Sequence, residues 1–342
     1  MRSPSPRDEP LAWFGGLLAT GLADVTDDPA ALDGDGWWAV VATFEGGLTA
    51  ARFHDVRPAP LPLAPWTGVP LDAWTSTLDC AAYQGAVAAV RAQVADGQVY
   101  QANICRVLSA PLPPGADMVG LAGLLVTGNP APYAGAVVLP QHGLHVATAS
   151  PELYLSRDGE TVESGPIKGT GRTAADLTDK DRAENVMIAD LVRNDLGRVA
   201  VTGGVDVPVL CAVEQHPGLV HLVSRVRARL RPRARWGDLL AATFPPGSVS
   251  GAPKSSALRL IAELEPTPRG PYCGAVGWVD ATRRRARLAV GIRTFWGQDD
   301  RLLFGTGAGI TWGSDPSAEW AETELKARRL LSVAARQGRI SA

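Results

Sequence analysis

Apolar and polar positions near the start of the chain predict one β-hairpin. Residues 37–44 form a run of β-prone side chains, Gly46 and Gly47 supply a tight turn, and residues 48–53 return as the second strand. No helical periodicity competes with this pattern. We therefore assign residues 1–57 to an N-terminal hairpin region that contributes to the same fold as the rest of the chain.

The next segment is rich in proline. Five prolines fall between Pro58 and Pro70, and this density is typical of an extended chain, not of a packed helix or strand. We interpret residues 58–77 as a linker on the surface. The remaining residues, 78–335, then form the main domain, to which the motifs below belong.

Beyond residue 78 helical and extended patterns alternate irregularly. Residues 81–96 have helical spacing and end at Gly97, a suitable C-terminal cap. The βαβ spacing of a doubly wound parallel sheet is missing, so an α/β fold of the α+β type with antiparallel strands is the better prediction. The other predicted elements are strands at 99–108 and 144–149, a hairpin of 152–156 and 160–164, and a helix that begins at Thr178.

Composition narrows the class of protein without identifying it. Of 342 residues, 46% are hydrophobic and 20% charged, and the formal net charge is −2, which gives no global reason to expect nucleic acid or an anionic membrane as a partner. The arginine runs at 231–235 and 283–287 are interpreted as solvated loops or strand ends, with basic patches as the alternative. We find no membrane-spanning stretch or signal peptide, and four dispersed cysteines without C-x-x-C spacing indicate reduced thiols, so a cytoplasmic location is expected.

Two predicted helices carry matched pairs of acidic residues. Asp181 and Glu184 are three residues apart, as are Glu319 and Glu322, so each pair lies on one helix face. Each pair alone has an ordinary interpretation: acidic residues favour a helix N-terminus, and Glu322 can pair with Lys326. Together the four carboxylates offer the oxygen ligands that Mg²⁺ prefers. Sequence spacing does not show that the two helices face each other.

Three glycine-rich segments offer further candidate chemistry. Lys168 stands among glycines and apolar residues in GPIKGTGRT, where desolvation would lower its pKa and free its amine as a nucleophile, although an ordinary turn lysine fits too. Glu152 is a candidate acid or base. Residues 243–254 are a generic anion-binding turn without P-loop spacing, and GTGAGI at 305–310, with Arg293 one strand earlier, suits a carboxylate.

In their order along the chain these segments resemble the chorismate-binding enzymes: anthranilate synthase component I, aminodeoxychorismate synthase component I, isochorismate synthase and salicylate synthase. The resemblance covers most of residues 78–331. It implies two large antiparallel sheets in a sandwich with helices outside, the anthranilate-synthase-like fold. The matching segments are YQANICR, SPELYL, GPIKGT, KDRAENVMIADLVRNDLGRV, HLVS, FPPGSVSGAPK, GPYCGAVG, IRT and GAGI through EWAETELKA.

The resemblance implies a role for each matching residue. Glu184 and Glu322 correspond to Mg²⁺ ligands, and Asp181 and Glu319 to positions that reach the metal through water. His221 and Ser248 correspond to positions near the substrate ring and its departing hydroxyl, although a lone histidine in an apolar strand is usually a core residue. The positions that correspond to substrate-binding groups are Arg293, Tyr272, Lys326, Gly307, Ala308, Gly309, Gln101, Gly169 and Thr170.

Two positions separate the family members. Gln101 stands where isochorismate and salicylate synthases have a lysine that activates water, so an amine-using member is favoured. Lys168 stands where anthranilate synthases usually carry alanine, and the PIKGT segment is similar to that of aminodeoxychorismate synthases. The implied product is 4-amino-4-deoxychorismate, formed through a covalent adduct of Lys168 with Glu152 as acid, for para-aminobenzoate and folate or a specialised pathway. Ammonia would come from a separate glutamine amidotransferase.

Departures from the family pattern keep other interpretations open. FPPGS replaces the more usual FPGGS at Pro246, and the short N-terminal part puts bound tryptophan and tryptophan feedback in doubt. Anthranilate synthase component I is the alternative enzyme. A catalytically silent chorismate-binding subunit is an alternative of another class, and it would be expected to have lost a metal carboxylate or Lys168.

Overall fold

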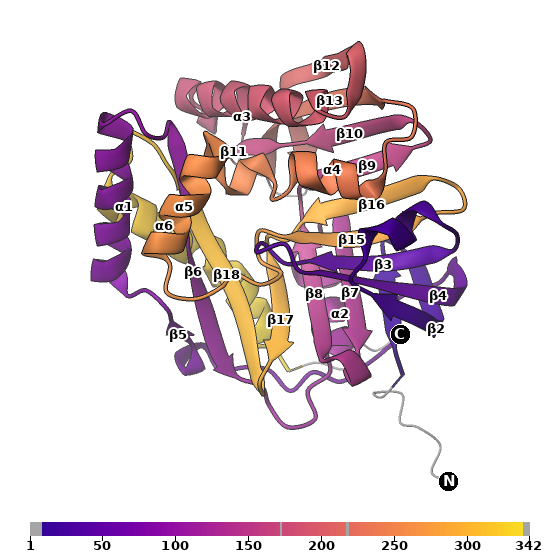
Figure 1. Ribbon diagram of the computed structural model, residues 1–342. Helices are drawn as coiled ribbons and strands as arrows, with labels where there is room; N and C mark the ends of the chain where they lie inside the picture. Colours follow the sequence, from indigo (N-terminus) through magenta and orange to yellow (C-terminus); the bar gives the residue numbers. More distant parts are fainter. Residues whose placement is uncertain (1–8, 172, 217–218, 338–342) are drawn as a thin grey trace.

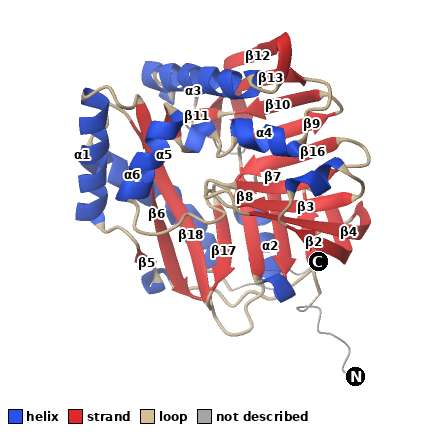
Figure 2. Cartoon of the chain, in the orientation of Figure 1, coloured by secondary structure: helices blue, strands red, loops and turns tan. Residues whose placement is uncertain are grey.

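The computed structural model describes residues 9–171, 173–216 and 219–337. Antiparallel strands dominate it, with helices packed around them (Figure 1, Figure 2). The helices are α1 (Cys80–Ala95), α2 (Met118–Gly128), α3 (Asp179–Gly197), α4 (Trp236–Thr243), α5 (Lys254–Leu264) and α6 (Pro316–Ala334). The strands are β1 (Leu11–Phe14), β2 (Leu17–Thr26), β3 (Trp37–Ala42), β4 (Leu48–Pro58), β5 (Thr75–Ser76), β6 (Gln101–Pro111), β7 (Tyr133–Leu139), β8 (Leu144–Ser150), β9 (Leu153–Asp158), β10 (Thr161–Gly165), β11 (Ile167–Gly171), β12 (Ala200–His216), β13 (Leu219–Leu230), β14 (Gly251–Ala252), β15 (Ala275–Asp280), β16 (Arg285–Val290), β17 (Thr294–Gln298) and β18 (Arg301–Ile310).

Backbone pairing joins the strands into one continuous antiparallel network. One arm runs β6–β18–β17–β8–β7–β1, and the other runs β2–β4–β3–β15–β16–β9–β10–β13–β12. The arms meet at the β1–β2 hairpin, where Phe14 pairs with Leu17. The antiparallel α/β class is confirmed. The expected sandwich is present, and its two layers are arms of one sheet, because β1 pairs with a strand of each arm.

Strand alternation explains how the arms pack. Val137 of β7 belongs to the same core cluster as Trp37 of β3, so this core lies between the two arms. The next residue, Val138, belongs to a second cluster with Leu121 of α2 and Leu330 of α6. Since neighbouring side chains of a strand point to opposite faces, the first arm lies between the second arm and these two helices.

Elements with strong local signals form where the sequence predicts them. The β3–β4 hairpin pairs Ala42 with Leu48 around the predicted glycine turn. Helix α1 is capped by the Asp79 side chain, which accepts a hydrogen bond from Ala82 N at 2.8 Å, and Gly97 follows it with φ +71°. Helix α3 begins after Thr178 with a capping box. These boundaries follow from side chains within a few residues of each helix end.

The proline-rich segment differs from the expected surface linker. Trp66 and Val69 are 2% and 0% exposed, and Trp66 Nε1 donates a hydrogen bond to Ala334 O at 2.7 Å. Both side chains belong to the second core cluster, beneath the end of α6. The prolines do keep the segment largely without regular structure, but its two bulky apolar residues anchor it to the core. Leu63 and Leu71 remain exposed, as expected of a linker.

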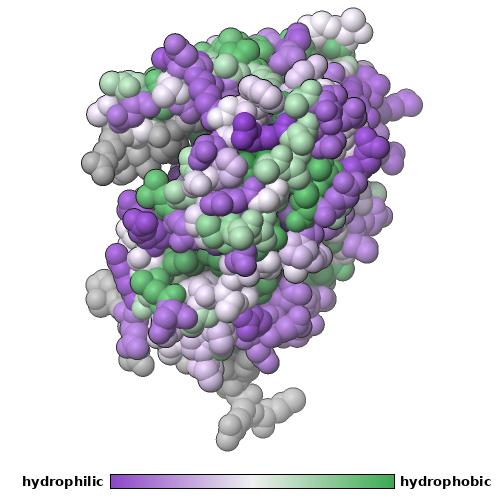
Figure 3. Space-filling view, turned by 90° about the vertical axis from the view of Figure 1, so that its left-hand side faces the viewer, coloured by the Kyte–Doolittle hydropathy of each residue, from purple (hydrophilic) through white to green (hydrophobic). Residues whose placement is uncertain are grey.

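The surface is mixed in polarity, and the cysteines are thiols. On the side of the molecule where α1 lies, hydrophobic residues are interleaved with hydrophilic ones (Figure 3). Among the helices that the structure describes, none has both the length and the apolar character needed to cross a membrane. All four cysteines are free thiols, with Cys105 and Cys273 buried and Cys80 exposed.

Candidate active site

Lys168 is placed by a bulge in β11. Lys168 pairs with Leu222 of β13 and Thr170 pairs with His221, so the register shifts at Gly169 between them. Gly169 has φ +75°, and a Cβ there would lie 2.9 Å from the Cβ of Asp181. Both facts require glycine. Gly169 therefore lets β11 pass the first turn of α3, and the side chain of Thr170 lies outside the described residues.

Three strands meet at the Lys168 amine. A Cβ built on Gly309 of β18 would stand 3.3 Å from Lys168 Nζ and 2.6 Å from Gln101 Nε2 of β6. Loss of hydration lowers the pKa of Lys168, and the positive charge of Lys326 lowers it further, against the opposing effect of Glu184. The neutral amine is thus more accessible than in an ordinary surface lysine, as the sequence predicted.

Gln101 is a buried amide without a hydrogen-bond partner. Its side chain is 0% exposed, and among the described residues neither Nε2 nor Oε1 has a partner. An unpaired buried amide costs on the order of 1–3 kcal/mol. Since Gln101 lies beside Gly309 and the Lys168 amine, its donor and acceptor are available to a molecule bound there.

Glu152 lies next to this group, in the connection between β8 and β9. Burial raises its pKa to about 7, while a hydrogen bond from the Ser248 hydroxyl, the nearby Lys168 charge and the Ile167 N–H each oppose that rise. Val290 N donates a hydrogen bond to Glu152 O at 3.0 Å and fixes its backbone. A carboxyl group that titrates near neutral pH can both give and take a proton. The hydroxyl group of Ser248, a residue that is 7% exposed, therefore contacts the Glu152 carboxyl group directly.

We expect Glu152→Gln to stabilise the protein at pH 8 but not at pH 4.5. Because the folded-state pKa is raised from 4.5 to about 7, the unfolded chain loses this proton first, and stability falls as pH rises through that window. Across this pH window the free energy of unfolding of the wild type falls by about 3 kcal/mol. Glutamine does not ionise, so the variant does not lose this stability as pH rises. Thermal unfolding of both proteins at the two pH values measures the effect, and an equal difference at both would contradict it.

The four acidic residues lie on α3 and α6, whose charges act on each other. Glu184 and Glu322 both influence Lys168, and Lys180 of α3 influences both Glu322 and Glu319 of α6. The two helices therefore face each other across Lys168, which the sequence did not show. The lysine partners of the carboxylates are close: Lys180 Nζ lies 3.7 Å from Glu184 Oε1, and the corresponding distance from Lys326 to Glu322 is 2.6 Å.

The same acidic residues differ in their surroundings. Asp181 accepts hydrogen bonds from Thr178 N and Oγ1 at 2.8 and 2.7 Å, so it also serves the helix cap. Burial and then the Glu322 charge raise the pKa of Glu319, with a Ser314 hydrogen bond opposing them. Burial would raise the pKa of Glu322 as well, but Lys326 and the two other lysines hold it below its usual value. Glu322 is thus an ionised carboxylate at neutral pH.

These residues suit a hard divalent cation. All four donors are carboxylate oxygens, and the present partners of Glu184 and Glu322 are lysine ammonium groups, which a cation could replace. Within the described part of the chain no three His, Cys, Asp or Glu side chains form a ready-made ligand cluster. Mg²⁺ takes one or two protein carboxylates and completes its shell with water and substrate oxygens. Two facing carboxylates therefore fit Mg²⁺ better than a metal that needs a full protein cage.

The predicted substrate-carboxylate residues have separate contacts. Arg293 precedes β17 with φ +52°, and both burial and the charge of Arg329 lower its pKa. Its guanidinium has no ion pair among the described residues, which suits an incoming anion. The Tyr272 ring packs on Gly305, where a Cβ would lie 2.0 Å from Tyr272 Cγ, and its hydroxyl interacts with the Cys105 thiol. The contacts of these two residues do not run to Lys168.

The remaining predicted residues lie along β13 and β18. His221 is buried at 2% exposure on β13, beside the strand that bears Lys168. Lys326 Nζ donates a hydrogen bond to Gly307 O at 3.0 Å and so ties α6 to β18. Ala308 is buried. Gly307 leaves room for the Cys105 thiol, because a Cβ at position 307 would lie 2.7 Å from Cys105 Sγ. The glycines of β18 are thus required by packing as well as by any ligand.

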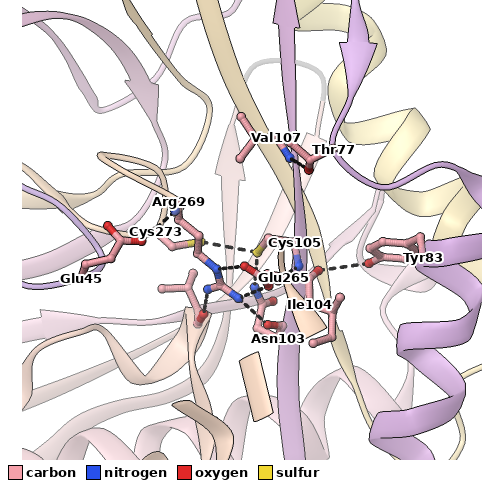
Figure 4. A network of polar contacts seen from close by, with 11 residues as sticks. Glu45, Thr77, Tyr83, Asn103, Ile104, Cys105, Val107, Glu265, Arg269 and Cys273 are labelled. Carbon is pink, nitrogen blue, oxygen red and sulfur yellow. Dashed lines mark hydrogen bonds and ion pairs between the residues drawn. The ribbon is translucent and has the colours of Figure 1, made fainter. Parts of the chain in front are cut away.

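Sequence reasoning missed a buried arginine that braces the site. Arg269 is 1% exposed and donates to Glu265 Oε2 at 2.8 Å, to Val249 O at 2.9 Å and to Asn103 O at 2.6 Å (Figure 4). Val249 follows Ser248, and Asn103 is two residues from Gln101, so Arg269 connects the two strand and loop segments that carry them. Glu265 Oε1 also accepts from Cys105 N at 2.8 Å. Glu265 stands four residues before this arginine, but the Val249 and Asn103 carbonyls are distant in sequence, so no local pattern marks the whole network.

A second brace holds α3 to the loop that bears Ser248. Lys254 Nζ lies 2.7 Å from Asp195 Oδ2 and 3.0 Å from Thr243 O. From the sequence, Lys254 could be identified only as the last residue of a glycine-rich turn. A cavity of about 620 Å³ lies elsewhere, between α4, α5 and the β3–β4 turn. The candidate active site is therefore assigned from its converging polar groups.

Comparisons with known proteins place the chain in a family. Residues 49–332 match the family model described as chorismate binding enzyme. The chain is 40% identical over 303 residues to anthranilate synthase component 1 of Streptomyces coelicolor, covering 82% of this chain and 58% of that protein. It is 36% identical over 271 residues to aminodeoxychorismate synthase component 1 of Salmonella typhimurium, covering 76% and 59%. The matches thus span little more than half of these relatives.

The fold is also similar to a solved structure. Anthranilate synthase component I from Streptococcus pneumoniae superposes with a TM-score of 0.77 at 25% identity, covering 97% of this chain and 93% of that one. The match extends over nearly all of both chains, so the two proteins share their fold. The expected anthranilate-synthase-like fold is confirmed.

Proposed function

Because this chain belongs to the family of chorismate binding enzymes, we propose that it aminates chorismate to 4-amino-4-deoxychorismate. The observation that supports this product most is the Lys168 amine, which lies beside Gly309 and Gln101 with a lowered pKa. According to the resemblance, anthranilate synthases usually carry alanine at this position. A lysine there supplies a nucleophile that the ortho-aminating enzymes do not need.

The proposed reaction begins at the Lys168 amine. Its lone pair forms a bond to C2 of chorismate, the ring double bonds shift, and the C4 hydroxyl leaves with the proton of Glu152 as water. Ammonia then bonds to C4, the double bonds shift back, and the C2–N bond breaks to return the neutral Lys168 amine. Glu152, now ionised, takes the extra proton from the new C4 ammonium group. A carboxyl with a pKa of about 7 suits both duties.

Glu184 and Glu322 would hold Mg²⁺, with Asp181 and Glu319 reaching it through water. When bound, the ion would supply positive charge for a substrate carboxylate. Arg293 is suited to bind a carboxylate, since its guanidinium is partly desolvated and lacks an ion pair within the described residues. Gln101 stands where the water-adding enzymes of the resemblance have their activating lysine, and this exchange favours amination over hydration.

The ammonia would come from a partner protein, because every residue assigned above is proposed to bind chorismate or Mg²⁺ or to react with chorismate. We propose a separate glutamine amidotransferase for this supply, with free ammonium as its substitute in vitro. A different enzyme, a lyase that eliminates pyruvate, would release para-aminobenzoate from the product. Whether the pathway leads to folate or to a specialised product depends on that later step.

Anthranilate synthase component I is the second candidate, and one observation favours it. The Streptomyces coelicolor protein of that name is more similar to this chain, at 40% identity, than the aminodeoxychorismate synthase component at 36%. Identity over the whole chain weighs many positions that do not touch substrate, whereas Lys168 bears on the chemistry itself. We therefore keep the para-aminating reaction as the first candidate.

Incubation of the purified chain with chorismate, Mg²⁺ and ammonium near pH 8.5 tests the proposal. Chromatography and mass spectrometry should detect 4-amino-4-deoxychorismate. A lyase that eliminates pyruvate then converts this product to para-aminobenzoate. Anthranilate as the main product would support the second candidate, and isochorismate would contradict the interpretation of Gln101. No consumption of chorismate, with or without an amidotransferase, would indicate a silent subunit.

We expect activity to depend on Mg²⁺ through Glu322. A chelator should abolish turnover, and excess Mg²⁺ should restore it. Glu322→Gln keeps the shape of the side chain but removes its charge, so it should raise the Mg²⁺ dissociation constant at least about 10-fold. Isothermal titration with Mg²⁺ measures this without turnover. Glu263→Gln, which removes an exposed charge from α5, is the matched control and should bind Mg²⁺ as the wild type does.

A further inference from the structure

The two arginine runs of the sequence converge in the fold. Residues 231–235 lead into α4, and residues 283–287 form the turn and first part of β16. Together with the end of β9 they surround a cavity of about 460 Å³, and Figure 1 shows α4, β9 and β16 side by side. The arginines that line the cavity are Arg157, Arg233, Arg235, Arg284 and Arg285.

The cavity carries an excess of positive charge. Asp33 is the one acidic residue among its lining residues, and its carboxylate already accepts a hydrogen bond from Trp236 N at 3.1 Å. Arg284 pairs with Glu160 at 2.7 Å, and Arg285 pairs with Asp158 at 3.4 Å, both at the exposed rim. Within the described ranges the other three arginines have no ion pair at all.

Arg157 shows the effect of this excess most clearly. It is only 7% exposed, its Nε donates to Gly159 O at 2.9 Å, and its guanidinium carbon lies 5.7 Å from the centre of the Trp236 ring. Burial and the nearby Arg284 charge lower its pKa, while Asp33 and Glu160 oppose that change. A buried guanidinium held next to like charges indicates that an anion belongs there.

Backbone conformation is the second, independent observation. Arg233 and Arg284 have φ values of +67° and +53°, in the left-handed region that a non-glycine residue rarely adopts. Non-glycine residues held in this region are strained, and such residues gather at ligand-binding sites. Both strained residues point to the same cavity, one from each arginine run.

We propose that this cavity binds a phosphate-bearing small molecule. Converging planar guanidinium forks match the oxygens of a phosphate, and a phosphomonoester dianion balances more of the excess charge than a single carboxylate can. The cavity volume lies within the range of small-molecule sites. Helix α4 runs from this cavity to the loop that carries Ser248, a length of about 12 Å, so a bound phosphate also steadies an element next to the candidate active site.

Thermal unfolding of the whole chain with inorganic phosphate and with pyrophosphate tests the proposal, against sodium chloride at equal ionic strength. The variant R233G/R284G removes two guanidinium groups while glycine suits both left-handed positions. The control R259Q/R328Q removes two exposed arginine charges from α5 and α6. We expect phosphate to raise the Tm of the wild type and the control alike, and its dissociation constant to rise at least about 10-fold in R233G/R284G.

Hydrogen exchange locates the effect. Phosphate should slow exchange in residues 231–243 and at the β15–β16 turn of the wild type. A Tm rise no larger than that in chloride, an equal phosphate response in R233G/R284G, or protection confined to another part of the chain would each overturn the proposal. None of these measurements uses turnover, so the outcome is independent of the reaction proposed above.

Discussion

Lys168→Ala is expected to lower the formation of 4-amino-4-deoxychorismate by about 10³-fold or more, since loss of a covalent nucleophile has effects of this size. The structure places the Lys168 amine where its hydration is reduced and where Gln101 and Gly309 leave room for a substrate. Mg²⁺ and chorismate binding should persist, because the carboxylates on α3 and α6 are untouched. Product analysis and isothermal titration on the same protein separate the two effects.

The covalent adduct gives this prediction a direct measurement. Wild-type protein mixed with chorismate and Mg²⁺ in the absence of ammonia should gain the mass of chorismate less water, on a peptide that contains Lys168. Lys168→Met keeps most of the side-chain volume and is the matched control for a cavity at this position. Any residual product of either variant should be anthranilate, from direct addition of ammonia at C2. Full 4-amino-4-deoxychorismate activity without the lysine would exclude the covalent route.

Local structure was predictable because its causes are local. The Asp79 and Thr178 caps, the glycine turn after β3 and the Asp158 turn between β9 and β10 each depend on side chains within a few residues. The continuity of the sheet was not predictable, because it rests on β1 pairing with both β2 and β7. Trp66 shows the same limit: five neighbouring prolines predicted a surface segment, and a contact with Ala334, far along the chain, buries it.

The candidate active site was likewise only partly predictable from the sequence. Residue type and spacing singled out Lys168, Glu152 and the two acidic pairs, because each has a recognisable chemistry within a short motif. That α3 and α6 face each other is a tertiary fact, visible only in the shared influence of their charges on Lys168. The braces at Arg269 and Lys254 belong to no recognisable motif, since Val249 and Asn103, which Arg269 binds besides its neighbour Glu265, and Asp195, which Lys254 binds, lie in other segments.

Arg269→Met is expected to cost about 3–5 kcal/mol in the free energy of unfolding, the typical effect of removing one partner from a buried ion pair. Arg269 and Glu265 are 1% and 6% exposed, so the substitution leaves an uncompensated carboxylate in the core. The Val249 and Asn103 carbonyls lose their donor at the same time. Chemical denaturation of the wild type and the variant measures the loss.

A second variant separates the buried charge from the lost packing. E265Q/R269M has no stranded carboxylate, so it should recover part of the stability that Arg269→Met loses, while the carbonyls of Val249 and Asn103 stay unpaired. Because those carbonyls fix the segments of Ser248 and Gln101, the double variant should remain folded and yet turn over more slowly than the wild type. A loss below about 1 kcal/mol in Arg269→Met, the size of an exposed pair, would show that the network of Figure 4 does not brace the site.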